Sequence, residues 1–200
     1  MGDDLDGPLL KTTVTKADVE AFCDVCVPMR SIWKHFQILF EGTESQRQLL
    51  QNIAPIFFGD LNKLLIEHLI LQICKITDPE DSRGHKNLTV EFLVKNSDFS
   101  DVPEELGKLE KLSLDMHHFR TKIVPARNKL IGHLDRDSVL QDQPLGAADQ
   151  NEWNQFWLDL QDFLNIMHKR YVDRSGQFYL NGIGYLSDAD ILVNAIGRES

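Results

Sequence analysis

The sequence predicts an all-α protein, a helical bundle with kinked long helices and a short C-terminal helical appendage. Apolar residues recur every three or four positions in each long segment, as on the buried face of a helix. No stretch of useful length alternates apolar and polar residues, the pattern of a half-buried strand. The 42% of hydrophobic residues is typical of a globular protein. Because no run of about 18 apolar residues occurs, we expect no transmembrane helix.

Breaks in the helical pattern divide the chain into three parts. Residues 1–14 are acidic, contain the pair Gly7-Pro8 and are expected to form a flexible tail. Residues 15–173 carry the helical periodicity and form the main domain. Residues 174–200 contain closely spaced glycines and then a short apolar pattern, which predicts a turn and a short helix capped by Ser187.

The first helix is expected to begin at Thr15, because Thr15 and Asp18 have the spacing of a capping box. Its periodicity continues to Phe40. Pro28 lies inside it and predicts either one kinked helix or two abutting helices.

Gly42 ends this first element, and Ser45 is expected to cap the next one. The apolar spacing of residues 46–76 is helical nearly throughout. Pro55 and Gly59 predict a break within it.

Residues 78–86 are polar and predict a loop, with a small basic cluster formed by Arg83, His85 and Lys86. Residues 88–96 predict a short helix. A long helix then begins at a proline in its first turn, Pro103, where the missing N–H costs nothing.

Pro125 is expected to kink that long helix or to restart it just before Arg127. Residues 136–151 are polar and predict a loop. The last long helix carries a stripe of large apolar residues that we expect in the core or in a dimer interface. The stripe consists of Trp153, Phe156, Trp157, Leu160, Phe163, Leu164, Met167 and Tyr171.

The formal net charge of −10 counts against broad electrostatic binding of nucleic acid, which depends on Lys and Arg. A nuclease of this composition needs a local basic pocket. An acidic surface equally suits docking on a basic partner.

The cysteines and the N-terminus favour a cytoplasmic protein. Cys23 and Cys26 form a single C-x-x-C pair and Cys74 stands apart, so we expect reduced thiols and no zinc site. The acidic N-terminus lacks the apolar segment of a secretory signal.

Residues 125–135, PARNKLIGHLD, contain a pattern that packing does not require. Arg127 offers a fixed fork of donors that suits phosphate. His133 is the side-chain type best suited to move protons near neutral pH. Together they could hold a phosphodiester and carry out acid–base chemistry on it.

The spacing of Arg127 and His133 favours a dimer. On a regular helix, six residues correspond to about 600°, some 120° out of line, and to about 9 Å along the axis. The two side chains would therefore not meet as direct neighbours. Two copies of the helix around a two-fold axis could bring both pairs into one cleft.

The motif resembles that of the HEPN superfamily, and its form resembles most the abortive-infection U-type branch of phage-exclusion proteins. The resemblance extends over residues 44–171 and includes residues 76–79, ITDP, and residues 87–90, NLTV. It implies a HEPN-type bundle and a metal-independent endoribonuclease of a phage-defence or toxin–antitoxin system. It also implies a composite site at a homodimer interface, and an antitoxin or nucleotidyltransferase is a candidate partner.

In such a site, His133 would act as general base on the ribose 2′-hydroxyl or as general acid on the leaving oxygen. Arg127 would stabilise the charge that develops on phosphorus. Asn128 would orient the phosphate, and Asp135 is a candidate acceptor that orients His133. The RNA supplies the nucleophile, so no cofactor or metal is expected and the product is a 2′,3′-cyclic phosphate.

Two alternatives stay open. Arg127 could form an ion pair with a helix-borne carboxylate while His133 merely ends the helix. Alternatively, the chain could be a noncatalytic HEPN-type scaffold that binds a protein or nucleotide partner. A metal site is not expected, since the adjacent His117 and His118 point about 100° apart on a helix.

Overall fold

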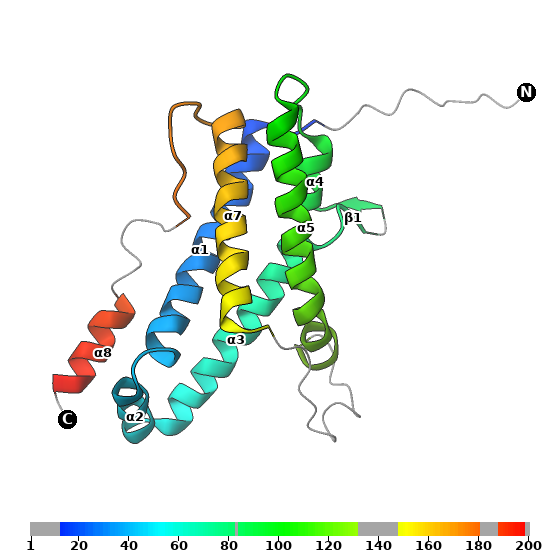
Figure 1. Cartoon of the computed structure of the whole chain (residues 1–200). Coiled ribbons are helices and arrows are strands. Elements are labelled where there is room, and N and C mark those ends of the chain that lie inside the picture. The colour runs from blue at the N-terminus through cyan, green and yellow to red at the C-terminus, as the bar shows by residue number, and fades with distance from the viewer. Residues whose placement is uncertain (1–12, 83, 132–147, 181–187, 199–200) are drawn as a thin grey trace, which may run out of the picture.

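The computed structural model describes residues 13–82, 84–131, 148–180 and 188–198, and these are almost entirely helical (Figure 1). This confirms the predicted all-α class. The elements in chain order are α1 (Lys16–Phe40), α2 (Glu44–Ile53), α3 (Pro55–Thr77), β1 (Asp81–Ser82), β2 (His85–Lys86), α4 (Val90–Asn96), α5 (Pro103–Ala126), the π-helix η1 (Arg127–Ile131), α7 (Gln150–Tyr171) and α8 (Asp188–Arg198).

The start of α1 is the predicted capping box. The Thr15 hydroxyl accepts from the Asp18 N–H at 3.3 Å, and the Asp18 carboxylate accepts from the Thr15 N–H at 2.8 Å. Helix α1 is one helix that continues through Pro28, so the alternative of two abutting helices is wrong.

The predicted cap of the next segment is wrong, whereas the predicted break is present between α2 and α3. Thr43, not Ser45, caps α2, and the Gln46 side-chain oxygen accepts a hydrogen bond from the Thr43 N–H at 2.8 Å. Ser45 and Gln48 have the same spacing, but Ser45 lies inside the helix. Pro55 begins α3 as predicted, but Gly59 lies inside that helix. A glycine lowers helix propensity by about 1 kcal/mol without removing a hydrogen bond, so it need not end a helix.

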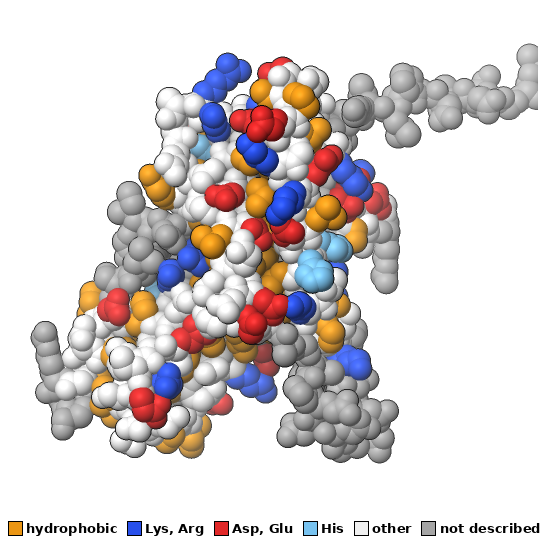
Figure 2. Space-filling view, viewed as in Figure 1, with side chains coloured by type: hydrophobic (Ala, Val, Ile, Leu, Met, Phe, Trp, Pro, Cys, Tyr) orange, Lys and Arg blue, Asp and Glu red, His pale blue; other side chains and the backbone are white. Residues whose placement is uncertain are grey.

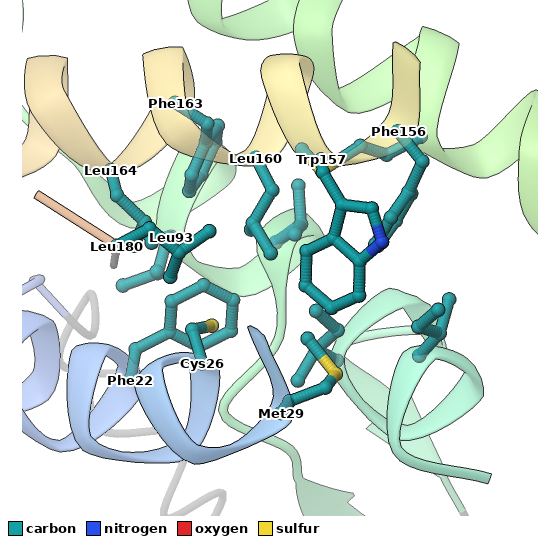
Figure 3. Packing of buried hydrophobic residues seen from close by; sticks show 14 of the residues in the cluster. Phe22, Cys26, Met29, Leu93, Phe156, Trp157, Leu160, Phe163, Leu164 and Leu180 are labelled. Atoms are coloured by element: carbon teal, nitrogen blue, oxygen red, sulfur yellow. The ribbon is translucent and has the colours of Figure 1, made fainter. Parts of the chain in front are cut away.

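Helices α1, α3, α5 and α7 pack around one apolar core (Figures 1 and 3). Trp33 of α1 stacks on Trp153 of α7 with ring centroids 4.8 Å apart. In Figure 3, Trp157 and Phe163 of α7 point toward α1. The predicted aromatic stripe of α7 therefore belongs to the core, where aromatic residues bury the most apolar area.

The described ends of the chain pack on this bundle. Val14, the last residue of the predicted tail, is buried and donates its N–H to the Asn96 carbonyl at 2.9 Å. The Gln161 side-chain oxygen accepts a hydrogen bond from the Leu180 N–H at 2.8 Å. Helix α8 packs through Ala189 and Val193 in a second apolar cluster with the ends of α1 and α2. Residues 1–12 and the predicted cap Ser187 lie outside the described residues.

No helix in the described part of the chain is both long and apolar enough to cross a bilayer. The cytoplasmic location stays a prediction.

Candidate functional site

Helix α5 continues through Pro125, and the change at Arg127 is one of helix type. Proline removes the N–H that would bond the carbonyl four residues earlier. The Arg127 N–H bonds both the Ile123 and Val124 carbonyls, and η1 then follows as a π-helix. Such π-helical turns are rare in proteins overall, and those that occur lie frequently at functional sites.

The π-helix removes the basis of the angular argument for Arg127 and His133. That calculation assumed α-helical geometry over residues 127–133, whereas a π-helix bonds each N–H five residues back and so turns less per residue. His133 and Asp135 lie outside the described residues. Their roles, and the arrangement of two such motifs in a dimer, stay predictions.

The structure brings Arg127 and Asn128 together. The Arg127 Nη1 donates to the Asn128 Oδ1 at 2.8 Å, and Asn128 is exposed whereas Arg127 is half-buried. Among the described residues, no carboxylate forms an ion pair with Arg127. The alternative in which Arg127 merely pairs with a helix-borne carboxylate therefore finds no partner in that part of the chain.

Arg127 lines a cavity of about 590 Å³, here called the hairpin pocket, between the end of α3, the β1–β2 hairpin and the end of α5. Lys75 of α3 and Lys86 of β2 also line it, as do Asp78 and Asp81. Volumes of about 300–1,000 Å³ are usual for small-ligand sites. The pocket is therefore large enough for a nucleotide unit.

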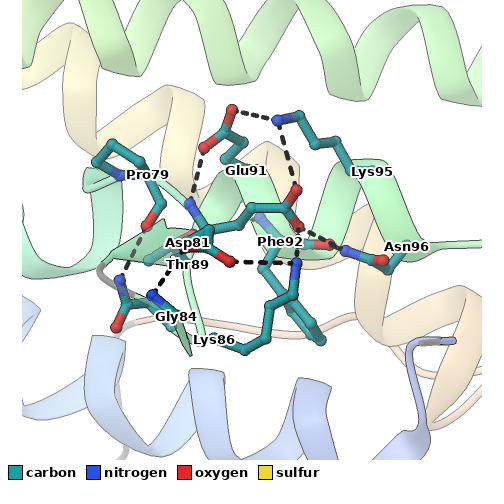
Figure 4. A network of polar contacts seen from close by, with 11 residues as sticks. Pro79, Asp81, Gly84, Lys86, Thr89, Glu91, Phe92, Lys95 and Asn96 are labelled. Carbon is teal, nitrogen blue, oxygen red and sulfur yellow. Dashed lines mark hydrogen bonds and ion pairs between the residues drawn. The ribbon is translucent and has the colours of Figure 1, made fainter. Parts of the chain in front are cut away.

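The hairpin replaces the predicted polar loop and is held against α4 (Figure 4). The Glu80 N–H donates to the Glu91 carboxylate at 2.8 Å, and the Asn96 amide donates to the Glu80 carboxylate at 2.9 Å. Gly84 has φ +82° in the turn, a conformation that glycine adopts without strain. These contacts fix the strand that carries Lys86.

Charge pairing leaves the hairpin pocket locally basic. The Arg120 guanidinium forms an ion pair with the Asp78 carboxylate. The Lys86 Nζ lies 3.9 Å from carboxylate oxygens of both Glu80 and Asp81. Within the described ranges, Lys75 and Arg127 have no carboxylate partner. An anion entering the pocket would therefore meet two uncompensated cations.

Sequence reasoning identified Arg127 but missed Lys75, Asp78 and Arg120. Lys75 and Asp78 precede Arg127 by about fifty residues, and a fold is needed to bring them together. The only local signal was the segment 76–79, which ends α3 beside the hairpin pocket.

The three cysteines are free and buried. Burial raises the pKa of Cys23 to about 12, and burial also raises the pKa of Cys26 and Cys74. Such thiols are poor nucleophiles and poor metal ligands. The described residues contain no group of three or more potential metal ligands.

Comparison with known proteins identifies the family. No curated protein and no solved structure matched the chain. A family model described as AbiU2, a HEPN type, matches residues 15–183, which include the core, the hairpin pocket and the whole Arg127–Asp135 motif. The chain therefore belongs to the AbiU2 family of HEPN proteins.

Proposed function

We propose that the protein is a metal-independent endoribonuclease of a phage-defence or toxin–antitoxin system. The observation that carries the proposal is the position of Arg127, whose guanidinium lines the hairpin pocket without a carboxylate partner among the described residues. Membership of a HEPN family is consistent with such a role.

Arg127 binds the scissile phosphate and stabilises the charge that develops on it. A guanidinium presents parallel N–H donors to two phosphate oxygens, and a partly buried one is little screened by water. Asn128 keeps the fork oriented through its 2.8 Å hydrogen bond. Lys75 adds attraction for a neighbouring phosphate in a protein whose net charge otherwise repels RNA.

His133 transfers the proton. It takes the proton of the ribose 2′-hydroxyl or protonates the leaving 5′-oxygen, and Asp135 is a candidate acceptor for its ring N–H. The nucleophile belongs to the substrate, so the reaction requires neither metal nor cofactor. A second copy of the chain completes the site, and an antitoxin or nucleotidyltransferase restrains it.

A noncatalytic scaffold is the second candidate. The net charge of −10 favours a basic protein partner over RNA. This candidate predicts a stable complex with a partner and no turnover of RNA.

Cleavage of single-stranded RNA by the purified protein in the presence of EDTA separates the two candidates. The nuclease is expected to leave a 2′,3′-cyclic phosphate on the upstream product. An otherwise identical oligonucleotide with deoxyribose at the cleaved position is the matched control and should stay intact, because it lacks the nucleophile. Absence of cleavage of varied RNAs would favour the scaffold.

A further inference from the structure

A groove between α5 and α7 forms a second cavity of about 340 Å³, here called the α5–α7 groove. Figure 2 shows the face on which these two helices lie in front, with acidic and basic side chains interspersed over them. Residues from Lys111 to Lys122 of α5 and from Glu152 to Asp159 of α7 line the groove. By the helical rise, it extends about 16 Å along α5.

Both lysines of the groove are already paired. The Lys111 Nζ lies 2.7 Å from the Asp115 carboxylate, and Lys122 forms an ion pair with Glu152. These pairs compensate two of the three carboxylates that line the groove. The third carboxylate is that of Asp159.

Asp159 is buried and forms no ion pair among the described residues, although the more distant Lys111 acts on it electrostatically. It is only 6% exposed, and the Gln155 amide donates to its Oδ1 at 2.8 Å. Burial raises the pKa of Asp159 despite this hydrogen bond. Proteins rarely leave a buried carboxylate uncompensated, because the lost hydration is not recovered by one neutral donor.

Aromatic rings form the apolar wall of the α5–α7 groove next to this carboxylate. Phe119 and Phe156 line it, with ring centroids 4.9 Å apart and planes 28° from parallel. Both side chains are almost fully buried, at 5% and 1% exposed, so they offer the groove an apolar wall that attracts hydrocarbon groups. The groove therefore combines one unpaired negative charge with an aromatic wall.

We propose that the α5–α7 groove binds a small organic cation that carries one primary ammonium group on an apolar body. The ammonium group donates to the open oxygen of Asp159, and the apolar body packs against Phe119 and Phe156. One positive charge neutralises the groove, whereas an anion would meet Asp159 and lysines that are already paired. A metal ion finds no cluster of three ligands in the described part of the chain.

Calorimetric titration of the full-length protein with 2-phenylethylamine tests this site. We expect saturable binding with a Kd of about 1 mM, the usual range for so small a compound. 2-Phenylethanol has the same body without the charge and is expected to bind at least about tenfold more weakly, because it lacks a charge-assisted hydrogen bond. Equal affinity for the two compounds, or no saturable binding of the amine, would overturn the proposal.

A matched pair of variants assigns the binding to Asp159. Asp159→Asn keeps the shape and the Gln155 contact but removes the charge, and we expect about a tenfold loss of amine affinity. Asp60→Asn removes an exposed carboxylate of α3 and should bind the amine as the wild type does. Wild-type affinity of Asp159→Asn contradicts the proposal. If that variant fails to fold, the comparison of amine and alcohol on the wild type decides. No outcome depends on cleavage of RNA.

Discussion

Arg120 of α5 and Asp78 at the end of α3 form an ion pair that joins segments 42 residues apart, with the Arg120 Nη2 2.5 Å from the Asp78 Oδ1. The two side chains are only 18% and 26% exposed. Arg127, the first residue of η1, follows Arg120 of α5 by seven residues, or about two helical turns. Because Asp78 binds Arg120, it does not neutralise Arg127 in the same pocket.

Loss of the Arg120–Asp78 pair should destabilise the fold. Arg120→Gln leaves the carboxylate of Asp78 partly buried without its cation, and we expect the free energy of unfolding to fall by about 2 kcal/mol. Urea denaturation measures the change. Lys108→Gln removes an exposed pair with Glu104 and should change stability by no more than about 0.5 kcal/mol. If both substitutions lowered the free energy of unfolding equally, the buried pair would stabilise the fold no more than an exposed pair does.

Loss of the Arg127 side chain should leave the fold nearly unchanged. Its hydrogen-bond partner in the described residues is the neighbouring Asn128, so Arg127→Ala removes no long-range ion pair there. We expect the free energy of unfolding to change by no more than about 0.5 kcal/mol in the same urea experiment. A loss comparable to that of Arg120→Gln would instead assign Arg127 a structural role.

Local signals predicted most of the helices. The Thr15–Asp18 box and the prolines at positions 55 and 103 mark helix starts that the structure has. The prediction of Ser45 was wrong although Ser45 and Gln48 have the same spacing as Thr43 and Gln46, because the helix begins at the earlier of the two possible caps. Each of these signals depends on residues within about one helical turn of one another, which a sequence displays directly.

The candidate site was predictable only in part. The motif around Arg127 is local, and the sequence displays it. The contact of Asp78 with Arg120 and the approach of Lys75 to Arg127 depend on how α3 packs beside α5. The π-helix at Arg127 was not predicted either, because Pro125 indicates a disturbed helix without specifying its geometry.

Removal of the buried charge of Asp159 should stabilise the protein at neutral pH. Burial raises the folded-state pKa of this carboxyl above its unfolded value, so the ionised form weakens the fold. The contribution of this carboxyl to the free energy of unfolding is complete at pH values below its pKa in the unfolded state. It is lost as the pH rises through its pKa in the folded state. Asp159→Asn should therefore melt at a higher temperature than the wild type at pH 7. The difference should shrink as the pH falls to about 4. A lower melting temperature of Asp159→Asn than of the wild type at pH 7 would contradict the prediction that the buried charge destabilises the fold.

A composite site in a homodimer predicts complementation between two inactive variants. If one copy supplies Arg127 and the other His133, mixing Arg127→Ala with His133→Ala chains creates mixed dimers with one intact site. Random exchange makes half of the dimers mixed, so about a quarter of the wild-type activity should return. Light scattering checks that the mixture stays dimeric. A mixture as inactive as its components would place both side chains in one chain.

The rate of RNA cleavage by His133→Ala in the presence of EDTA tests the central claim most directly. Loss of the proton-transfer group should slow the reaction by roughly 10²–10⁴-fold. Arg127→Ala should do comparable damage that Arg127→Lys does not fully restore, because a lysine lacks the planar fork. His117→Ala removes an exposed histidine of α5 and serves as the matched control, with a rate near that of the wild type. A folded His133→Ala variant that cleaves RNA as fast as the wild type would contradict the account.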